Sequence, residues 1–314
     1  MSKYRTPRYL RVSLLSACNL QCSYCLPPGI KRPTVIAPDD KLRTAIRFLH
    51  DSGINKIRFT GGEPTLYKDL PELVSFVKSL DQDVHTAITS NGVHLKTMAK
   101  DLALAGLDSV NISLDTLDPD KFKALAGKDY LKRVISGVDA AIAHIGNVKL
   151  NSVLIKGVND DETEKLISFA ESRELDIRFI EFMPNRYSPL GDPRFISSEE
   201  IRGRLPWDFQ ALPTDSNSAG RYYIAPSLKA RIGFISSVSH PFCESCDRIR
   251  LAANGLLYTC LYESSNIDIF KLLAADSNRA QNEYKKLLQS KQFSGCHGAG
   301  KSGESLPSFS AIGG

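Results

Sequence analysis

The chain has 314 residues, of which 24% are charged and 42% are hydrophobic, and its formal net charge is +5. This balance is typical of globular proteins and excludes a disordered chain, while long basic tracts of the kind that bind nucleic acid are missing. The first ten residues lack an apolar signal core, and no apolar run is long enough to span a membrane. We therefore expect a cytoplasmic protein with no membrane or nucleic-acid partner.

Strand and helix patterns alternate over the first two thirds of the chain. Apolar runs rich in β-formers predict strands at residues 9–14, 56–60, 84–89, 109–114, 149–155 and 176–182. Helical periodicity predicts helices at residues 40–52, 70–80, 95–105, 131–145 and 161–173. Six successive strand–helix units indicate an α/β fold in which a parallel sheet curls into a barrel or partial barrel.

The pattern changes at residues 192–218, where Pro, Gly, Ser and Asp accumulate. Beyond this stretch the sequence predicts short strands at residues 221–225, 232–236, 248–252 and 256–259, and helices at residues 267–275 and 282–288. We therefore predict a barrel over residues 1–195, a smaller α+β region over residues 196–293, and a flexible tail over residues 294–314.

Six of the seven cysteines form two triplets. Cys18, Cys22 and Cys25 have C-x3-C-x2-C spacing, and Cys243, Cys246 and Cys260 have C-x2-C-x13-C spacing. Four-iron clusters normally take four thiolates, so each triplet predicts a metal site with one open position. For the second triplet, a zinc site with Cys296 or His297 as the fourth ligand is the alternative; otherwise Cys296 is an incidental thiol. Disulfides are disfavoured because nothing in the sequence indicates secretion.

Glycine-rich and polar segments follow the predicted strands. The first triplet, Gly61-Gly62-Glu63-Pro64, Thr89-Ser90-Asn91-Gly92, Ser113-Leu114-Asp115, Lys156-Gly157 and Glu181-Phe182-Met183-Pro184 stand at successive strand ends. Any one of these segments alone is more often a plain turn. Because the carboxyl ends of parallel strands lie on one rim of a barrel, where active sites form, the whole set predicts a single site.

Six cations form a second group. Arg11, Arg58 and Arg178 lie within predicted strands, Lys156 ends one, and Arg248 and Arg250 share one face of a strand. A buried guanidinium is costly unless it meets an anion, so the group predicts an anionic substrate such as a polyphosphate. The alternative is that each cation pairs with a local carboxylate such as Asp247 or Glu181.

The first triplet, with Tyr24 inside it and Gly61-Gly62-Glu63-Pro64 after it, resembles the radical S-adenosylmethionine (SAM) enzymes. The closer resemblance is to the GTP 3′,8-cyclase family of molybdenum cofactor biosynthesis (molybdenum cofactor biosynthesis protein A, MoaA). It is carried by KIRFTGGEP at residues 56–64, FCESCDRIRL at residues 242–251 and the terminal Gly313-Gly314. Leu15-Ser16-Ala17 and the residues ahead of Gly313 depart from the family pattern.

The resemblance implies a partial (β/α)6 TIM-type barrel, two [4Fe-4S] clusters and SAM. Cys18, Cys22 and Cys25 would hold the first cluster, and Cys243, Cys246 and Cys260 the second. SAM would be contacted by Tyr24, Gly61, Gly62, Glu63, Thr89, Ser113 and Met183. GTP would be contacted by Arg11, Arg58, Lys156, Arg178, Arg248 and Arg250. The first triplet, Arg248, Arg250, Gly313 and Gly314 would be needed for catalysis.

The resemblance also implies a reaction. A 5′-deoxyadenosyl radical from SAM would remove hydrogen from C3′ of GTP, giving 3′,8-cyclo-7,8-dihydro-GTP for a cyclic pyranopterin monophosphate synthase. The electron donor and the choice between monomer and homodimer stay open. Two alternatives are another two-cluster radical SAM enzyme, such as a divergent paralogue or a peptide-modifying type, and a non-catalytic metal- or nucleotide-binding protein.

Overall fold

The computed structural model of the protein describes residues 6–26, 29, 34–185, 191–213, 218–263, 265 and 267–291. The predicted tail, including Cys296, Gly313 and Gly314, lies outside the described residues.

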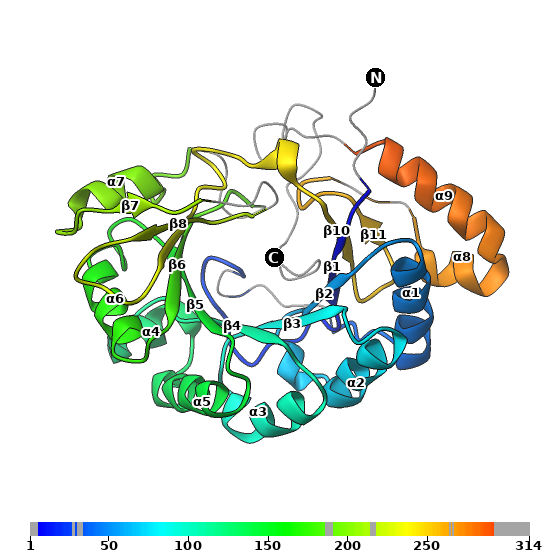
Figure 1. Ribbon diagram of the computed structural model, residues 1–314, viewed down its shortest axis with the longest axis horizontal. Coiled ribbons are helices and arrows are strands. Elements are labelled where there is room, and N and C mark those ends of the chain that lie inside the picture. Colours follow the sequence, from blue (N-terminus) through cyan, green and yellow to red (C-terminus); the bar gives the residue numbers. More distant parts are fainter. Residues whose placement is uncertain are drawn as a thin grey trace.

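The described residues form an eleven-stranded sheet in the order β11-β10-β1-β2-β3-β4-β5-β6-β9-β8-β7. Its first six strands are β1 Tyr9–Ser13, β2 Lys56–Thr60, β3 His85–Ser90, β4 Ser109–Ser113, β5 Val148–Leu154 and β6 Asp176–Glu181. These six are parallel and neighbours in chain order. Figure 1 shows that they curve, with helices on the outer side. The open, curved sheet confirms the predicted α/β partial barrel.

Five outer helices match their predicted positions to within two residues at each end. They are α1 Asp39–Asp51, α2 Leu70–Leu80, α3 Leu95–Leu104, α5 Leu131–His144 and α6 Thr163–Glu171. The short helix α4, Pro119–Ala126, was not predicted. Its signals lie at its ends, because Asp118 caps the first turn, Pro119 occupies the first position and Gly127 ends the helix at φ 71.

The second part of the chain extends the same sheet at both ends. Its strands are β7 Gln210–Ala211, β8 Arg221–Ile224, β9 Ile232–Ile235, β10 Arg248–Leu251 and β11 Leu257–Tyr258. Its helices are α7 Ser198–Arg204, α8 Ile269–Ala275 and α9 Ser277–Gln289. Two short 3-10 helices also occur, η1 Pro64–Leu66 after β2 and η2 Cys243–Ser245 before β10. β9 pairs with β6 and β10 pairs with β1, both in parallel. The division at residues 195 and 196 stays a prediction about chain organisation, because in space the two parts share one sheet.

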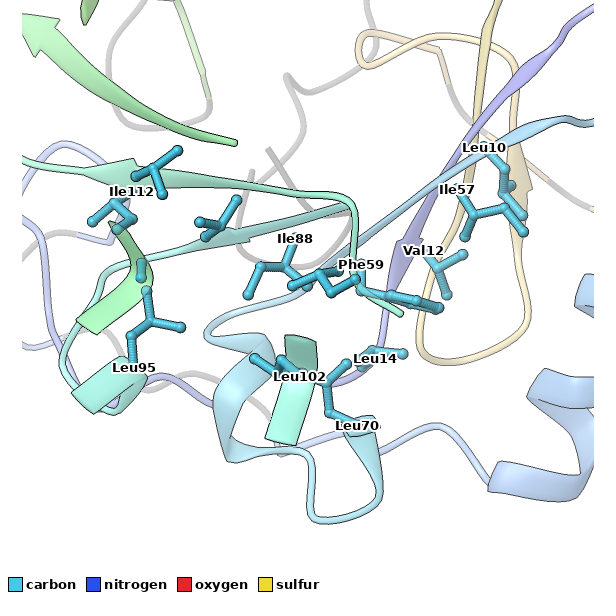
Figure 2. Packing of buried hydrophobic residues seen from close by; sticks show 14 of the residues in the cluster. Leu10, Val12, Leu14, Ile57, Phe59, Leu70, Ile88, Leu95, Leu102 and Ile112 are labelled. Carbon is cyan, nitrogen blue, oxygen red and sulfur yellow. The ribbon is translucent and has the colours of Figure 1, made fainter. Parts of the chain in front are cut away.

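The core lies between the sheet and the outer helices. Figure 2 shows Val12, Phe59 and Ile88 of the sheet beside Leu70 and Leu102 of the helices, and all five side chains are fully buried. Successive residues of a strand point to opposite faces, so each apolar residue on the helix side places its neighbour on the inner side of the curved sheet. Because of this alternation, β1 and β2 can present apolar residues to the helices and guanidinium groups to the inner side of the sheet.

Helix α5 lies very close to the loop that follows β3. A Cβ added to Gly137 of α5 would stand 2.0 Å from the carbonyl oxygen of Gly92. We expect Gly137→Ala to lower the free energy of unfolding by about 1–3 kcal/mol, because backbone must move to admit the methyl group. Gly203 of α7 is the matched control, since a Cβ there meets nothing within 4 Å, and Gly203→Ala should stabilise by up to about 1 kcal/mol. Urea unfolding measures both, and equal effects would contradict the close approach.

Candidate active site

A cavity of about 960 Å³ occupies the inner side of the curved sheet. It is lined by residues from all six parallel strands, from the loops at their ends and from β10. The predicted site residues in its wall are Cys18, Cys22, Tyr24, Cys25, Gly61, Gly62, Glu63, Thr89, Ser113, Met183, Arg11, Arg58, Arg178, Arg248 and Arg250. The fold therefore brings the first triplet, the strand-end segments and five of the six predicted cations to one chamber.

The loop that carries the first triplet lies against the glycine pair that follows β2. The amide of Gly62 donates to the carbonyl of Leu15 at 2.7 Å, and the amide of Glu63 donates to the carbonyl of Ala17 at 2.9 Å. A Cβ at Gly62 would stand 2.0 Å from the Ala17 oxygen, and Gly61 has φ 148. Glycine is therefore required at both positions for the two loops to meet.

The first triplet offers sulfur ligands in a setting that suits an iron–sulfur cluster. Its three cysteines form no disulfide and are half-buried. Cys18 Sγ accepts hydrogen bonds from the Leu20 amide at 3.4 Å and from Asn91 Nδ2 at 3.7 Å. Burial, then the Asp115 carboxylate, raises the pKa of the Cys22 thiol well above its usual range, so a bound cation is needed to hold it as a thiolate. Thiolate ligands with amide donors around them are the surroundings that such clusters use.

The Glu63 carboxylate is 1% exposed and joins the loops after β2 and β3. Oε1 accepts from the amide and hydroxyl of Thr65 at 3.1 and 2.7 Å and from Ser90 Oγ at 2.7 Å. Oε2 accepts from the Asn91 amide at 2.7 Å. Burial raises the pKa of Glu63, while these hydrogen bonds act to lower it. The side chain thus fixes the positions of the two loops relative to one another.

Tyr24 ties the first-triplet loop to the strands on the other side of the cavity. Its hydroxyl donates to Asp115 Oδ2 at 2.8 Å, and Asp115 Oδ1 accepts from the Val153 amide at 2.8 Å. Burial raises the pKa of Asp115 to about 6 and, with Asp115 beside it, raises the pKa of Tyr24 well above its usual range. Asp115 was not among the predicted site residues, although its place at a strand end was visible in the sequence.

Two arginines of the cavity wall donate hydrogen bonds to side-chain and backbone oxygens on neighbouring strands. Arg58, 7% exposed, donates from Nε to the Tyr9 hydroxyl oxygen at 2.6 Å and from Nη1 to the Ile88 carbonyl at 2.8 Å. Arg178 donates from Nε to Asn151 Oδ1 at 2.8 Å. These contacts orient both guanidinium groups while leaving their positive charges in the cavity wall.

The cations of the wall are crowded. Arg11 stands beside Arg250 on one neighbouring strand and beside Arg58 on the other. Burial, then Arg250, lowers the pKa of Arg11 to about 9, and burial also lowers the pKa values of Arg178 and Arg250. Like charges held together away from water favour the binding of an anion among them.

One predicted cation stands apart from the other five, and sequence reasoning missed further cations of the cavity wall. Lys156 is not among the residues that line the cavity; it is about half exposed, and its Nζ lies 4.0 Å from Glu200. Lys56, Lys149 and His85 do line the cavity. Lys149 and Asn151 are two residues apart on β5, so strand alternation was a signal that could have found Lys149.

The second triplet lies at the edge of the cavity. Cys243 begins η2, Cys246 follows it, and Cys260 comes shortly after β11. The adjacent residues Phe242, Asp247 and Leu261 line the cavity, although the three cysteines do not. The three cysteines form no disulfide and are half-buried.

The surroundings of the second triplet also provide donors to sulfur. Lys291 Nζ donates to the Cys246 carbonyl at 2.9 Å and lies 3.8 Å from Cys246 Sγ. The Tyr262 amide donates to Cys260 Sγ at 3.5 Å. Burial raises the pKa of Cys260. The donor set again fits thiolate ligation of a metal cluster.

Glu181 holds the segment that leads into the second triplet. This carboxylate, 2% exposed, accepts from the amides of Ser198, Val238 and Ser239, each at 2.9 Å. The sequence offered Glu181 as a local partner for an arginine, but the structure shows it accepting these amides. It is a positioning residue that sequence reasoning missed.

Two features are absent from the described part of the chain. No three His, Cys, Asp or Glu side chains there converge as ligands of a single metal ion. No helix there combines the length and apolar composition needed to cross a bilayer.

Two family models match consecutive parts of the chain. The model of the radical SAM superfamily matches residues 12–170, and the model named Molybdenum Cofactor Synthesis C matches residues 175–295. Among solved structures, a crystal structure of Streptococcus suis SuiB bound to S-adenosylmethionine aligns with a TM-score of 0.64 at 18% identity. The alignment covers 86% of this chain and 65% of that chain, and it supports the fold alone.

Relatives identified by sequence support a narrower family assignment. A GTP 3′,8-cyclase of Campylobacter jejuni subsp. doylei is 43% identical over 273 residues, covering 84% of this chain and 83% of that protein. A GTP 3′,8-cyclase of Alkaliphilus metalliredigens is 36% identical and covers 85% of each. Molybdenum cofactor biosynthesis protein 1 of Drosophila melanogaster is 38% identical, but the chain spans only 47% of its length. On these matches, together with the chamber described above, the chain belongs to the GTP 3′,8-cyclase family of the radical SAM superfamily.

Proposed function

We propose that this enzyme converts GTP to 3′,8-cyclo-7,8-dihydro-GTP in molybdenum cofactor biosynthesis, with SAM at one end of the cavity and GTP at the other. One observation carries the proposal: a single cavity is lined by the first cysteine triplet and by the buried and half-buried arginines of β1, β2, β6 and β10. A radical source and a polyanion site that share a chamber are what this reaction requires.

Cys18, Cys22 and Cys25 would hold one [4Fe-4S] cluster, and Cys243, Cys246 and Cys260 a second. Three thiolates leave one iron of each cluster open, for SAM at the first and for the guanine of GTP at the second. When bound, the reduced first cluster and SAM supply the radical that removes a hydrogen atom from the ribose.

The loops around the first triplet would bind SAM. Gly61, Gly62 and Glu63 present backbone groups beside the cysteine loop, and their hydrogen bonds to Leu15 and Ala17 hold them there. Thr89, Ser113 and Met183 line the cavity nearby and are proposed as further contacts to SAM. A loop pair fixed in this way binds its ligand without reorganising.

The arginines would bind the triphosphate, a part of the substrate that does not react. Arg11, Arg58, Arg178, Arg248 and Arg250 line the cavity, and Lys56 and Lys149, which line it too, are added to the proposal. Lys156, which is about half exposed and is not among the lining residues, stays a proposed contact. Binding energy from a remote group can be used to orient the reacting one. Holding the ribose against the radical source is then a proximity effect, and the enclosing wall limits side reactions with water.

Other parts of the proposal concern partners and the tail. A reductant must supply electrons to the first cluster, and a cyclic pyranopterin monophosphate synthase would receive the product. Gly313 and Gly314 are proposed to reach the active site, although they lie outside the described residues.

The test uses protein prepared without oxygen, assayed for iron, sulfide and zinc and then incubated with SAM, dithionite and GTP. We expect about eight iron atoms per chain, formation of 5′-deoxyadenosine and conversion of GTP to the cyclised nucleotide. Formation of 5′-deoxyadenosine without consumption of GTP would support another radical SAM activity. Protein that contains zinc and neither iron nor sulfide would support a non-catalytic binding protein.

A further inference from the structure

Tyr9 lies among the cations of the cavity wall. It is the first residue of β1, and its register partners are Lys56 on β2 and Arg248 on β10. Lys56 Nζ lies 5.1 Å and Arg248 Cζ 5.6 Å from the centre of its ring. Cations at these distances are attracted by the face of an aromatic ring. The ring therefore attracts one cation from β2, in the first part of the chain, and one from β10, in the second part.

The hydroxyl oxygen of Tyr9 also orients a third cation. It accepts from Arg58 Nε at 2.6 Å, while Arg58 Nη1 donates to the Ile88 carbonyl at 2.8 Å and to Thr89 Oγ1 at 3.3 Å. The short distance to the phenol oxygen is typical of a charge-assisted hydrogen bond. The Tyr9 amide donates to the Asp247 carbonyl at 3.4 Å, which fixes the strand beside the segment carrying the second triplet.

Most charged groups in this part of the wall are positive. They are Arg11 on β1, Lys56 and Arg58 on β2, Arg178 on β6, and Arg248 and Arg250 on β10; the cavity is also lined by Arg8 ahead of β1, His85 on β3, Tyr222 on β8 and Asp247 ahead of β10. Burial raises the pKa of the Tyr9 phenol, but Arg58, Arg11, Arg248 and Lys56 together outweigh burial and lower the pKa to about 7. Burial, then Lys56, lowers the pKa of His85, so the imidazole adds little charge at neutral pH.

We propose that Tyr9 is a positioning residue that supplies a negative charge to the empty polyanion site and takes up a proton when a triphosphate binds. The inference deepens the proposed function and rests on it for the identity of the nucleotide. The step balances simply, because one proton passes from solvent to the phenolate oxygen and no other covalent bond changes. A bound triphosphate brings its own negative charges to the same cations, so the phenolate is no longer stabilised and its pKa returns toward the ordinary value of about 10.

The pH dependence of triphosphate binding follows from the protonation of Tyr9 in the free protein and in the complex. The phenol is largely ionised above about pH 7 in the free protein and stays protonated in the complex up to a higher pH. Between these values binding takes up a proton, so affinity falls as the pH rises, by up to about tenfold per unit. Below about pH 6 both states are protonated, and binding involves no proton at this site.

The experiment is calorimetric titration of cluster-loaded protein with GTP, repeated in buffers of different ionisation enthalpy at about pH 8 and about pH 6. The variants are Tyr9→Phe, which keeps the ring for Lys56 and Arg248, and the control Tyr258→Phe. Tyr258 lies on β11 and is not among the residues that line the cavity. At about pH 8 we expect the wild type and Tyr258→Phe to take up nearly one proton more than Tyr9→Phe. At about pH 6 the three should agree.

Two further measurements separate this inference from the proposed function. Inorganic tripolyphosphate is the second probe, because it carries the anionic groups without the nucleoside. The phenolate absorption band of the wild type should decrease when either probe binds at about pH 8, and it should not change in Tyr9→Phe.

Equal proton uptake by the wild type and Tyr9→Phe would overturn the role of Tyr9 even if GTP is converted. Tyr9-dependent uptake with tripolyphosphate, in a protein that does not convert GTP, would leave the role of Tyr9 standing and overturn the cyclase activity. Failure to bind either probe would overturn both.

Discussion

Replacement of Cys243 by alanine is expected to abolish formation of the cyclised nucleotide while leaving reductive cleavage of SAM measurable. The two triplets lie apart in the fold, the first in the cavity wall and the second at the edge of the cavity beside Phe242 and Asp247. Loss of one ligand of the proposed second cluster should therefore leave the proposed SAM end of the chamber intact. Because loss of groups around a metal ligand already costs about 10- to 100-fold in affinity or activity, we expect product formation to fall by more than about 100-fold.

Two matched variants make this result interpretable. Cys22→Ala should lose 5′-deoxyadenosine and product together, because Cys22 belongs to the triplet proposed to bind SAM. Cys296→Ala, which removes the thiol predicted to be incidental, should retain both activities. Both products are quantified by chromatography after anaerobic turnover. Full product formation by Cys243→Ala would sink the assignment of the second cluster.

The second large effect is expected at Glu63. Its carboxylate accepts four hydrogen bonds from Thr65, Ser90 and Asn91 and is almost completely buried. Glu63→Ala would leave those donors without acceptors in a dry site, and each such donor costs about 1–3 kcal/mol. Allowing for relaxation, we expect the free energy of unfolding to fall by roughly 3 kcal/mol or more and the affinity for SAM to fall with it.

Glu72→Ala is the control for this prediction. Glu72 lies on the exposed face of α2, a short distance along the chain from the same loop. Its replacement should change stability by less than about 0.5 kcal/mol. Urea unfolding and calorimetric titration with SAM, on protein prepared without oxygen, measure both variants. If Glu63→Ala is as stable as Glu72→Ala, the carboxylate does not hold the loops together.

The strands and helices were predictable because their patterns are local. Arg58 stands between Ile57 and Phe59, and this alternation of apolar and cationic residues marked both the strand and its inward face. Likewise, Gly61 and Gly62 directly follow β2, so the glycine pair could be placed on the rim from the sequence alone.

What could not be predicted depends on contacts between distant segments. Nothing in the residues 248–251 indicates that this strand pairs with β1, and a two-residue strand such as β7 carries too little pattern to detect. Lys156 was predicted as a substrate contact from its place at a strand end and from the family resemblance, whereas the lining of the cavity depends on the direction of each side chain. Glu181 was offered only as an alternative partner for an arginine, because charge is visible in a sequence and the approach of backbone amides is not.

The pairing of β1 with β10 has a consequence for synthesis of the protein. β1 is synthesised well before β10, with β2 to β9 made between them, so one edge of the nascent sheet stays open in the meantime. That edge carries Arg11, and charged residues on an edge strand resist pairing with other chains. Closure of such a long-range contact is slow, so we expect the chamber to be completed only after β10 has been made. Cluster insertion would then be a late step in the maturation of the protein.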